Sequence, residues 1–394
     1  MTKKIKVLFV AEELATNGAM MSLLALLKAL PVDKYESSLF LFDHGGNLMN
    51  ELPSNVKVLP EKLAYSIHRL PTKQAIVKAV KHGRFDLIIY RMLLSLQRRW
   101  KLKYNMWWWL PEVDGEYDVV ISYSDGFVAP MILRKVTSGK KCCWVHVPYT
   151  HMPLYDYEYK ALRKADVCAT VSNDVGDALN KVLHGVSAPQ HIVHNIIDAE
   201  TCIMRAQEQC EEPHKDGVKR IVSVGRVTPA KGFEVICPTA KLLQEQNQHF
   251  EWYILGDGEE LQKFRQMAID MNVVENVHFV GNKSNPMPWV KSADVVVQPS
   301  TFESWGMTVS EALCLGKAVI TSDLPVFAEQ ITNGVNGIMR PAKPSYFAEA
   351  IKDVLTDDAF RNKLETNAAN YPFTREIVVR EFDQLMKKLN IYPE

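Results

Sequence analysis

Short apolar runs alternate with amphipathic segments along the whole chain. In the first half, the apolar runs predict strands at residues 6–12, 36–43, 85–90, 117–123, 141–147 and 166–172. In the second half, they predict strands at residues 221–226, 251–257, 277–281, 294–300 and 317–322. Val/Ile-rich runs that are each followed by a helical pattern indicate parallel strands covered by helices on both faces. The pattern therefore predicts an α/β protein with two doubly wound parallel-sheet domains.

Two further segments suggest where the domains divide. A polar stretch at residues 207–217 lies just before the second set of strands and is interpreted as an exposed loop near the junction. The amphipathic segment 374–389 follows a Tyr-Pro break and predicts a helix that packs back across the boundary. We therefore expect an N-terminal domain at 1–195, a C-terminal domain at 196–372, and a terminal segment at 373–394 whose helix packs on the N-terminal domain.

Composition excludes several classes of protein. The 394 residues include 46 Lys+Arg and 46 Asp+Glu, and 47% are hydrophobic, which excludes a disordered chain, a collagen-like fibre and a strongly basic nucleic-acid binder. The seven cysteines form no C-x-x-C pair, as is typical of a reduced cytosolic protein. No run reaches the roughly 18 apolar residues of a spanning helix, and the N-terminus reads as a buried strand, not a signal peptide. We expect a cytoplasmic protein without a nucleic-acid partner.

One segment departs from this neutral balance. Residues 57–103 contain twelve Lys/Arg against only Glu61 and Asp86. This segment runs into an aromatic group made up of Trp100, Tyr104, Trp107, Trp108 and Trp109. Basic residues beside tryptophans suit a helix that lies on an anionic lipid surface. A core helix that packs its tryptophans inward explains the pattern equally well, so peripheral membrane contact through residues 57–109 remains one of two interpretations.

The most informative motif spans residues 299–320, PSTFESWGMTVSEALCLGKAVI. A predicted strand ends at Ser300, and a helix is predicted to begin near Gly306 and Met307. The unpaired N–H groups and positive dipole end of a helix start suit a diphosphate, and glycine permits close backbone approach. The carboxylates of Glu303 and Glu311 could face one pocket and accept hydrogen bonds from a vicinal diol. Alternatively, Glu303 is a solvated loop residue and Glu311 an early-helix glutamate favoured by the dipole.

A second candidate lies at residues 221–236. A predicted strand ends in Gly225 and Arg226, and Lys231 with the glycine that follows is predicted to open a helix. An arginine and a lysine five residues apart around one turn could clamp a diphosphate, although simple surface charge is the alternative. The run that starts at Gly256 lacks the third glycine of a dinucleotide fingerprint and is interpreted as a strand-to-helix turn.

In the N-terminal half, His146 ends a predicted strand, which is where the sites of α/β proteins form. A lone histidine is more often structural, so both interpretations stand. The other histidines show no metal-ligand spacing, and we expect no metal site. Gly18 follows the first strand and could contact a phosphate or simply start a helix at 19–30. Because no G-x-S-x-G elbow is present, a hydrolase of that type is not expected.

Taken together, these motifs resemble those of retaining glycosyltransferases of family 4, which have the GT-B fold and build bacterial polysaccharides and glycoconjugates. The resemblance spans nearly the whole chain, and the segments that carry it are Asn195-Ile196-Ile197-Asp198, Gly225-Arg226…Lys231-Gly232, Gly256-Asp257-Gly258 and Glu303-x7-Glu311. Two departures are Asn17-Gly18 in place of a glycine pair, and Asn195-Ile196-Ile197-Asp198 in place of Asn-Gly-Val-Asp.

The resemblance implies a role for each matching residue. Glu303 would contact the donor sugar, Glu311 the ribose hydroxyls, and Arg226 and Lys231 the diphosphate, while His146 would lie near the reacting face of the sugar. The remaining donor contacts would come from Gly18, Gly225, Gly256, Ser304, Trp305, Gly306, Met307, Thr308 and Val309.

The function implied is transfer of a sugar from a nucleotide-diphosphate donor, a UDP-sugar, to a hydroxyl of a glycan or lipid-linked acceptor, with retention of anomeric configuration. Two Rossmann-like domains would face each other across a cleft, and neither a cofactor nor a metal would be required. Two alternatives remain at this point: a UDP-sugar 2-epimerase of the same fold, and a catalytically silent partner that binds nucleotide sugars.

Overall fold

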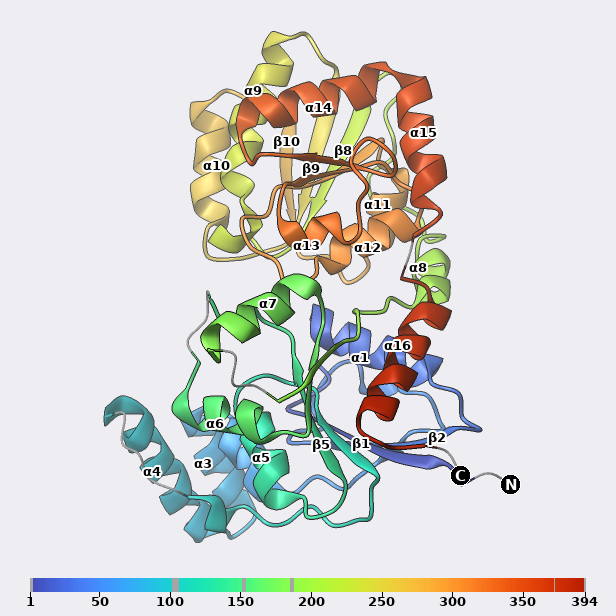
Figure 1. Cartoon of the computed structure of the whole chain (residues 1–394). Coiled ribbons are helices and arrows are strands. Elements are labelled where there is room, and N and C mark those ends of the chain that lie inside the picture. The colour runs from blue at the N-terminus through green and yellow to red at the C-terminus, as the bar shows by residue number, and fades with distance from the viewer. Residues whose placement is uncertain (1–2, 101–105, 151–153, 185–187, 372, 393–394) are drawn as a thin grey trace. The chain divides into compact units, whose positions relative to one another are not determined.

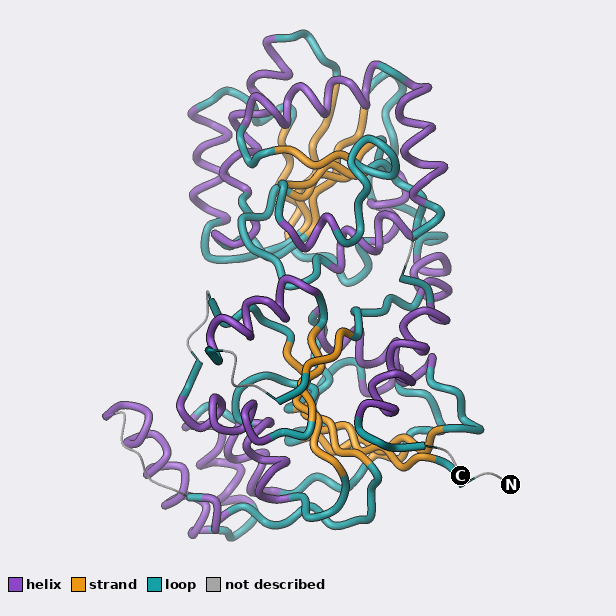
Figure 2. Tube along the Cα trace, viewed as in Figure 1, coloured by secondary structure: helices purple, strands orange, loops and turns teal. Residues whose placement is uncertain are grey.

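The computed structural model describes residues 3–100, 106–150, 154–184, 188–371 and 373–392, without the side chains of residues 98 and 100. The chain forms two compact units, unit 1 (Met1–Ile196 with Val378–Glu394) and unit 2 (Ile197–Ile377). Each unit contains one parallel sheet with helices packed against it (Figures 1 and 2). The prediction of two Rossmann-like parallel-sheet domains is thereby confirmed.

The sheet of unit 1 has seven strands in the order β3-β2-β1-β4-β5-β6-β7, and every neighbouring pair is parallel. The strands are β1 (Ile5–Ala11), β2 (Tyr35–Leu41), β3 (Lys57–Val58), β4 (Val119–Ser122), β5 (Lys140–Val145), β6 (Val167–Thr170) and β7 (Gln190–Ile192). Strand β1 is central, with Val7 opposite Ser37 on one side and Val119 on the other. Nearly all of its side chains are buried, as expected of a strand covered on both faces.

The helices of unit 1 include one from the end of the chain. They are α1 (Gly18–Ala29), α2 (Leu63–Arg69), α3 (Thr72–Lys81), α4 (Phe85–Trp100), α5 (Val128–Lys135), α6 (Asp156–Lys164), α7 (Asn173–Val182) and most of α16 (Arg375–Lys388). Phe382 of α16 stacks on Phe9 at a ring-centroid distance of 6.1 Å and meets Tyr35 edge-on at 5.4 Å. The carboxylate of Glu381 accepts a hydrogen bond from the backbone N–H of His194 at 3.0 Å. The last helix is therefore part of the unit 1 core.

The sheet of unit 2 has six strands in the order β10-β9-β8-β11-β12-β13. They are β8 (Lys219–Val224), β9 (Phe250–Leu255), β10 (Val277–Gly281), β11 (Val295–Gln298), β12 (Val319–Ser322) and β13 (Ile338–Arg340). The helices are α8 (Ala199–Arg205), α9 (Ile236–Glu245), α10 (Leu261–Asp270), α11 (Met287–Ser292), α12 (Met307–Cys314), α13 (Pro325–Ala328), α14 (Pro344–Thr356) and α15 (Asp358–Ala368). Ile221 and Val222 of β8 belong to different apolar clusters, so both faces of this sheet are buried.

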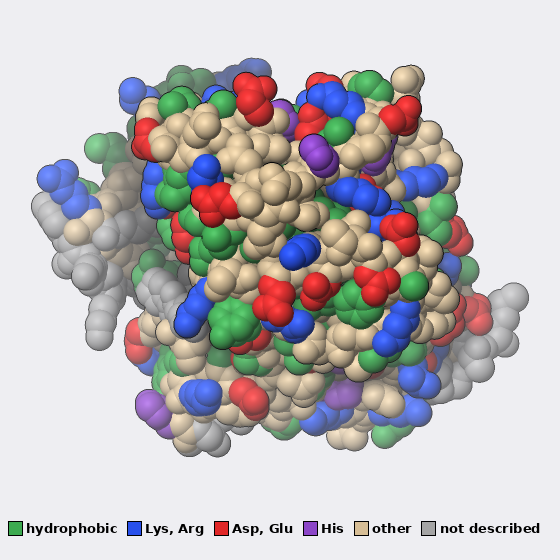
Figure 3. Space-filling view, turned by 90° about the horizontal axis from the view of Figure 1, so that it is seen from above, with side chains coloured by type: hydrophobic (Ala, Val, Ile, Leu, Met, Phe, Trp, Pro, Cys, Tyr) green, Lys and Arg blue, Asp and Glu red, His purple; other side chains and the backbone are tan. Residues whose placement is uncertain are grey.

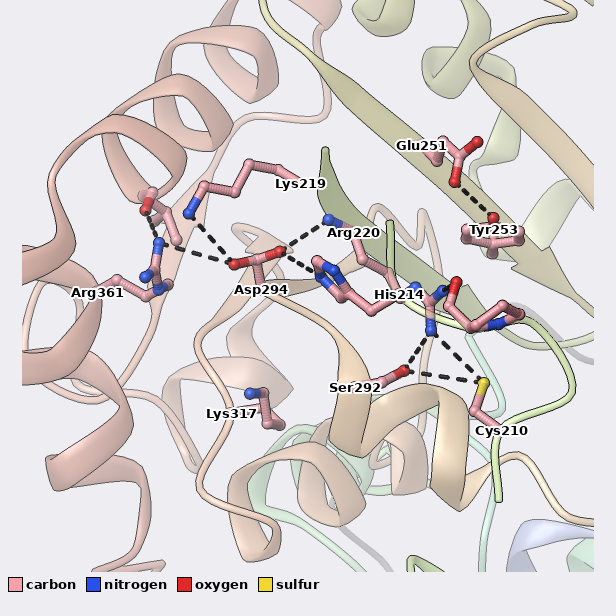
Figure 4. Close-up of polar contacts among 12 residues, drawn as sticks. Cys210, His214, Lys219, Arg220, Glu251, Tyr253, Ser292, Asp294, Lys317 and Arg361 are labelled. Atoms are coloured by element: carbon pink, nitrogen blue, oxygen red, sulfur yellow. Dashed lines mark hydrogen bonds and ion pairs between the residues drawn. The ribbon is translucent and has the colours of Figure 1, made fainter. Parts of the chain in front are cut away.

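The amino edge of this second sheet is held by charge pairs (Figure 4). Asp294 lies just before β11 and accepts a hydrogen bond from the backbone N–H of Arg220 at 2.8 Å, with Lys219 and Arg361 within 4 Å. Burial opposes ionisation of Asp294, but this hydrogen bond and the two cations outweigh it and lower its pKa. The loop at residues 207–217, which comes before β8 in the chain, is largely exposed, as predicted from its polar sequence.

Two sequence-based assignments are wrong. Residues 85–90 are not a strand but the start of α4, because the apolar pattern continues at helical spacing through Leu87, Tyr90 and Leu94, which all face the core. A short apolar run alone does not distinguish the two structures. The segment at Lys231 does not open an α-helix either. Two 3-10 turns, Pro229–Lys231 and Phe233–Val235, precede α9, and Gly232 separates them with a φ of 63°.

The sequence allowed the tryptophans after α4 to pack in the core or to lie exposed for membrane contact, and the structure shows both arrangements. Trp107 and Trp109 are partly buried against the unit 1 core, whereas Trp108 is 69% exposed. The side chain of Trp100 and all of Tyr104 lie outside the described residues. Within the part of the chain that the structure describes, no helix combines the length and apolar character needed to cross a membrane.

Candidate functional site

The predicted diphosphate and sugar residues follow strands β8 and β11, whose carboxyl ends lie side by side in the unit 2 sheet. Backbone hydrogen bonds join the two loops that follow: the N–H groups of Thr301 and Phe302 donate to the Ala230 carbonyl at 3.0 and 3.2 Å. Gly232 lies directly against Pro299, since a Cβ at Gly232 would be 2.1 Å from the Pro299 carbonyl oxygen. The fold therefore brings the two sequence motifs together.

An ion pair forms where these loops meet. Lys231 Nζ lies 2.5 Å from Glu303 Oε1, and the two side chains are only 19% and 11% exposed. The hydroxyl of Ser300 donates to the same carboxylate oxygen at 2.9 Å, and the amide of Gln298 donates to Ser300 at 2.9 Å. Glu303 is thus held in one orientation from two sides. The sequence analysis named Lys231 and Glu303 but missed their direct contact and the supporting Ser300, whose only signal was a hydroxyl at a strand end.

Arg226 is exposed on the turn after β8, and no ion pair of its guanidinium is found with the described residues. The glycines around it have packing roles. A Cβ at Gly225 would be 3.3 Å from Cε of Lys231, and a Cβ at Gly256 would be 1.9 Å from the Gly225 carbonyl oxygen. Gly256 thereby lets the turns after β8 and β9 come into contact. Donor contacts by Gly225 and Gly256 stay predictions.

The start of α12 lies in the same region. Gly306 is the N-cap residue with a φ of 84° and, as a glycine, has no side chain with which to cap the first turn. A Cβ at Gly306 would come 2.6 Å from the ring of Phe327, so the position requires glycine. The Thr308 hydroxyl donates to the carbonyl of Val224, the last residue of β8, at 3.4 Å. A helix start without a side-chain cap offers its first N–H groups and a partial positive charge to an anion.

Trp305 has a structural side chain. It is buried, and its indole N–H donates to Ser310 Oγ at 3.0 Å, which in turn donates to the Gln330 amide oxygen at 2.8 Å. The Tyr371 hydroxyl donates to the same serine at 2.8 Å. Any contact of Trp305 with a donor would therefore come from its backbone. Sequence reasoning missed this supporting network, because its members are distant in the chain.

Glu311 lies in the second turn of α12. Its side chain is partly buried, and burial raises its pKa to about 7, with the nearby guanidinium of Arg205 acting in the opposite direction. At neutral pH this carboxyl therefore exists in both protonation states. Either state can hydrogen-bond to a diol, since the ionised form accepts and the protonated form also donates.

The unit 1 candidates follow strands β1 and β5. Gly18 is exposed and is the first residue of α1, whose N-terminus is capped by Asn17 accepting from the Met20 N–H at 3.1 Å. The structure supports its role as a helix start, and its contact with a phosphate stays a prediction. His146 follows β5 and is buried, and neither of its ring nitrogens has a hydrogen-bond partner among the described residues. Burial lowers the pKa of His146 to about 4, with the backbone of Tyr123 opposing the shift.

A buried acidic network, made up of Asp125, Tyr149 and Glu158, lies beside His146. Asp125 accepts a hydrogen bond from the backbone N–H of His146 at 3.1 Å, and the Tyr149 hydroxyl lies within reach of both carboxylates. Burial raises the pKa of Asp125 to about 7, although the His146 N–H bond opposes this, and burial also raises the pKa of Glu158. Sequence reasoning missed this network; its only signal was an acidic residue two positions after a strand.

The remaining candidate groups are clusters of metal-ligating side chains and the cysteine thiols. Among residues 3–100, 106–150, 154–184, 188–371 and 373–392, no three His, Cys, Asp or Glu side chains are grouped as metal ligands. The seven cysteines are free thiols. Burial raises the pKa of Cys142, Cys168 and Cys202, so these thiols stay protonated at neutral pH.

Comparison with known proteins bears on the family and the fold of the chain. Residues 204–371 match the family model described as glycosyl transferases group 1. An uncharacterized glycosyltransferase of Methanocaldococcus jannaschii is 34% identical over 158 residues, 39% of this chain and 40% of that protein. The lipopolysaccharide core biosynthesis glycosyltransferase LpsE of Rhizobium meliloti is 27% identical over 170 residues, 42% of this chain and 49% of LpsE. The chain thus spans less than half the length of these relatives.

The solved structures extend the likeness to both units. HepE from Anabaena, crystallised in complex with UDP and glucose, has a TM-score of 0.68 and 17% identity, covering 97% of this chain and 99% of HepE. The chain has the GT-B fold. The family match and the relatives support a glycosyltransferase, and the matched segment 204–371 contains Arg226, Lys231, Glu303 and Glu311. Membership of family 4 and the significance of the Glu-x7-Glu spacing stay predictions.

Proposed function

We propose that this protein is a retaining glycosyltransferase that moves a sugar from a UDP-sugar to a hydroxyl of a glycan or lipid-linked acceptor. The observation that carries the proposal is the Lys231–Glu303 ion pair, 2.5 Å long and partly buried, in the same region as the start of α12, whose N-cap residue is Gly306. A cation, a carboxylate and a helix start together match a nucleotide sugar, which presents a diphosphate and sugar hydroxyls. HepE, of the same fold, is described in complex with UDP and glucose.

Unit 2 would hold the donor. As the bond between the anomeric carbon and the leaving phosphate oxygen breaks, negative charge builds on the diphosphate. Lys231, the exposed Arg226 and the N–H groups at the start of α12 would stabilise that charge. Glu303 would accept hydrogen bonds from sugar hydroxyls, and Glu311 from the ribose diol. Because three cationic or dipolar groups would face the diphosphate, the proposal includes no metal and no cofactor.

Unit 1 would hold the acceptor. The low pKa of His146 keeps its imidazole neutral at physiological pH, and its ring nitrogens can each serve one hydrogen bond, as donor or acceptor. A neutral ring suits a sugar or acceptor hydroxyl better than it suits a phosphate. Retention of configuration and a cytoplasmic site of action complete the proposal, and both rest on the resemblance of the motifs.

The test is release of nucleoside diphosphate from a panel of UDP-, GDP- and ADP-sugars, with and without candidate hydroxyl acceptors. Wild type is compared with Glu303→Gln and with Glu349→Gln, a control that removes an exposed glutamate on α14. We expect slow hydrolysis of one UDP-sugar, faster turnover with an acceptor, and loss of both in Glu303→Gln alone. Donor binding is measured in parallel by calorimetry.

Three results would contradict the proposal in distinguishable ways. Conversion of the donor to a different UDP-sugar without any acceptor would identify an epimerase. Tight donor binding with no turnover in the presence of any acceptor or of water would identify a silent binding partner. Absence of both binding and turnover for every donor would reject the site itself.

A further inference from the structure

The strongest unexplained feature of the surface is the outer side of helices α3 and α4 in unit 1. Seven large hydrophobic side chains on these helices are exposed: Val77, Val80, Phe85, Ile89, Met92, Leu93 and Leu96, with exposed fractions between 39% and 67%. We call this set the apolar face. It accounts for seven of the eighteen large hydrophobic side chains that are exposed in the described part of the chain. Scattered exposed hydrophobic residues are ordinary, but a concentration on two packed helices marks an interaction surface.

The apolar face is not left over from core packing. On α4 the core contacts come from Leu87, Tyr90 and Leu94, which are at most 7% exposed. The exposed residues Phe85, Ile89 and Met92 recur at intervals of three and four and therefore share a different side of the helix. Figure 1 shows α4 at the rim of unit 1, beside α3. Helix α4 is thus apolar on two sides, and folding of unit 1 uses only one of them.

The segment that carries the apolar face has an excess of positive charge, with twelve Lys/Arg and two acidic residues at 57–103. Both acidic residues of the 57–103 segment are already paired, Glu61 with Lys78 at 2.7 Å and Asp86 with Arg84 at 2.7 Å. No acidic side chain of the segment remains to offset the exposed Lys73, Lys81 and Arg99. On the face that Figure 3 shows, basic and acidic side chains are interspersed. The 57–103 segment differs from that face in combining exposed apolar side chains with excess positive charge.

We propose that the apolar face docks on an anionic lipid surface. Exposed Phe, Ile, Met and Leu side chains would enter the boundary between headgroups and acyl chains, while Lys73, Lys81 and Arg99 would contact the phosphates. A second copy of this chain fits less well, because a symmetric contact would bring the same basic residues opposite one another. This docking surface goes beyond the proposed sugar transfer and does not depend on it.

The test is co-flotation of the full chain with vesicles of neutral phosphatidylcholine, with or without about 30% anionic phosphatidylglycerol, at low and high salt. We expect binding to the anionic vesicles only, weakened by salt. The charge variant Lys73→Gln/Lys81→Gln/Arg99→Gln should bind about 100-fold more weakly, at about fivefold for each basic side chain. The apolar variant Ile89→Ser/Met92→Ser/Leu96→Ser should lose binding altogether.

Matched control variants test whether vesicle binding depends on the apolar face itself or on any exposed hydrophobic or basic side chains. Ile269→Ser/Val274→Ser/Val335→Ser removes three hydrophobic side chains that are 40–60% exposed on unit 2, and Lys181→Gln/Lys352→Gln/Lys387→Gln removes three exposed cations. Both should bind vesicles as wild type does. Thermal unfolding is recorded for each protein, and the single variant Met92→Gln replaces the apolar triple if that triple does not fold.

Three outcomes would overturn the proposal. One is wild-type protein that does not float with anionic vesicles. Another is binding that the charge and apolar variants reduce no more than their controls do. A third is a wild-type dimer that the apolar variant converts to a monomer in the absence of vesicle binding, which would assign the apolar face to a second copy of the chain.

Discussion

The carboxyl edges of the two sheets are both formed by parallel strands, but the ionisable side chains at the two edges differ in burial and in charge. In unit 2, the cation Lys231 meets the anion Glu303 in loops that remain partly open to water, and Arg226 is exposed. In unit 1, the ionisable groups next to His146 are buried, and burial favours their neutral forms: it lowers the pKa of His146 to about 4 and raises that of Asp125 to about 7. Glu311 of unit 2 also has a pKa raised to about 7, so the difference lies in the Lys231–Glu303 pair and the exposed Arg226. Under the proposed function, the unit 2 edge would bind the diphosphate and the unit 1 edge the acceptor hydroxyl.

The largest effect on catalysis should come from Lys231, at the carboxyl edge of the unit 2 sheet. Lys231→Ala removes a cation that would face the developing charge of the leaving diphosphate and leaves Glu303 without its ion-pair partner. We expect kcat for nucleoside diphosphate release to fall about 10²- to 10³-fold. Lys241→Ala, which removes a partly exposed lysine from α9, should leave kcat unchanged. A loss of less than about tenfold in Lys231→Ala would mean that unit 2 is not organised around a diphosphate.

The second-largest effect should be on the pH dependence of the free energy of unfolding, through Asp125 at the carboxyl edge of the unit 1 sheet. Because the pKa of Asp125 is raised to about 7 in the folded protein, the folded state holds a proton there that the unfolded chain releases near pH 4. The stability contributed by Asp125 is therefore present below about pH 4 and is lost as pH rises through 7, by at most about 4 kcal/mol.

Urea unfolding at pH 5 and pH 8 measures this difference. Asp125→Asn should be less sensitive to pH than wild type, because the amide does not titrate. Glu311 also has a raised pKa and contributes in the same direction, so the comparison is made between wild type and variant at each pH. Equal pH dependence in the two proteins would show that Asp125 is ionised in the folded state.

A smaller effect is expected from His146. With its pKa near 4, the imidazole should stay neutral across the working range, so kcat should show no inflection that depends on His146 between about pH 5.5 and 8. His146→Gln keeps one hydrogen-bonding amide and should lower kcat about tenfold at every pH in that range. An inflection near pH 6.5 that disappears in the variant would instead make His146 a titrating group in the reaction.

The smallest effect should come from Ser300. Ser300→Ala removes one of the two groups that orient the Glu303 carboxylate and should cost about 1 kcal/mol, or about fivefold in kcat/KM. Ser310→Ala is the contrasting variant, since it disrupts the contacts of Trp305, Gln330 and Tyr371 and should lower the thermal midpoint more than the rate. If the two variants changed the thermal midpoint and the rate equally, Ser300 would have no specific role in orienting Glu303 and would only support the fold, as Ser310 does.

The sequence predicted the sheets better than the contacts at their edges. Val/Ile-rich runs such as the one in β8 are sufficient for parallel strands, because their periodicity follows directly from burial on both faces. The run at 85–90 failed as a strand because six residues, five of them apolar, are compatible with either structure until the next ten are considered. Strands β3, β7 and β13, each of two or three residues, gave too short a pattern to predict.

Contacts at the candidate sites depend on topology and not on local pattern. Lys231 and Glu303 are 72 residues apart, and they meet because β8 and β11 are neighbours in the sheet. Asp125 and Glu158 approach Tyr149 in the same way, from a loop and from α6. Motif spacing located the separate residues, but only the strand order determines which of them touch.

The route of the chain through the two units has a consequence for synthesis. Unit 2 is continuous from Ile197 to Ile377, whereas unit 1 is completed by residues from 378 onward, including Phe382 in its core. As the polypeptide leaves the ribosome, unit 2 is fully synthesised while unit 1 still lacks α16. The unit that is synthesised first can therefore complete its core only after unit 2 has been made, and until then the surface of Phe9 that Phe382 covers stays open.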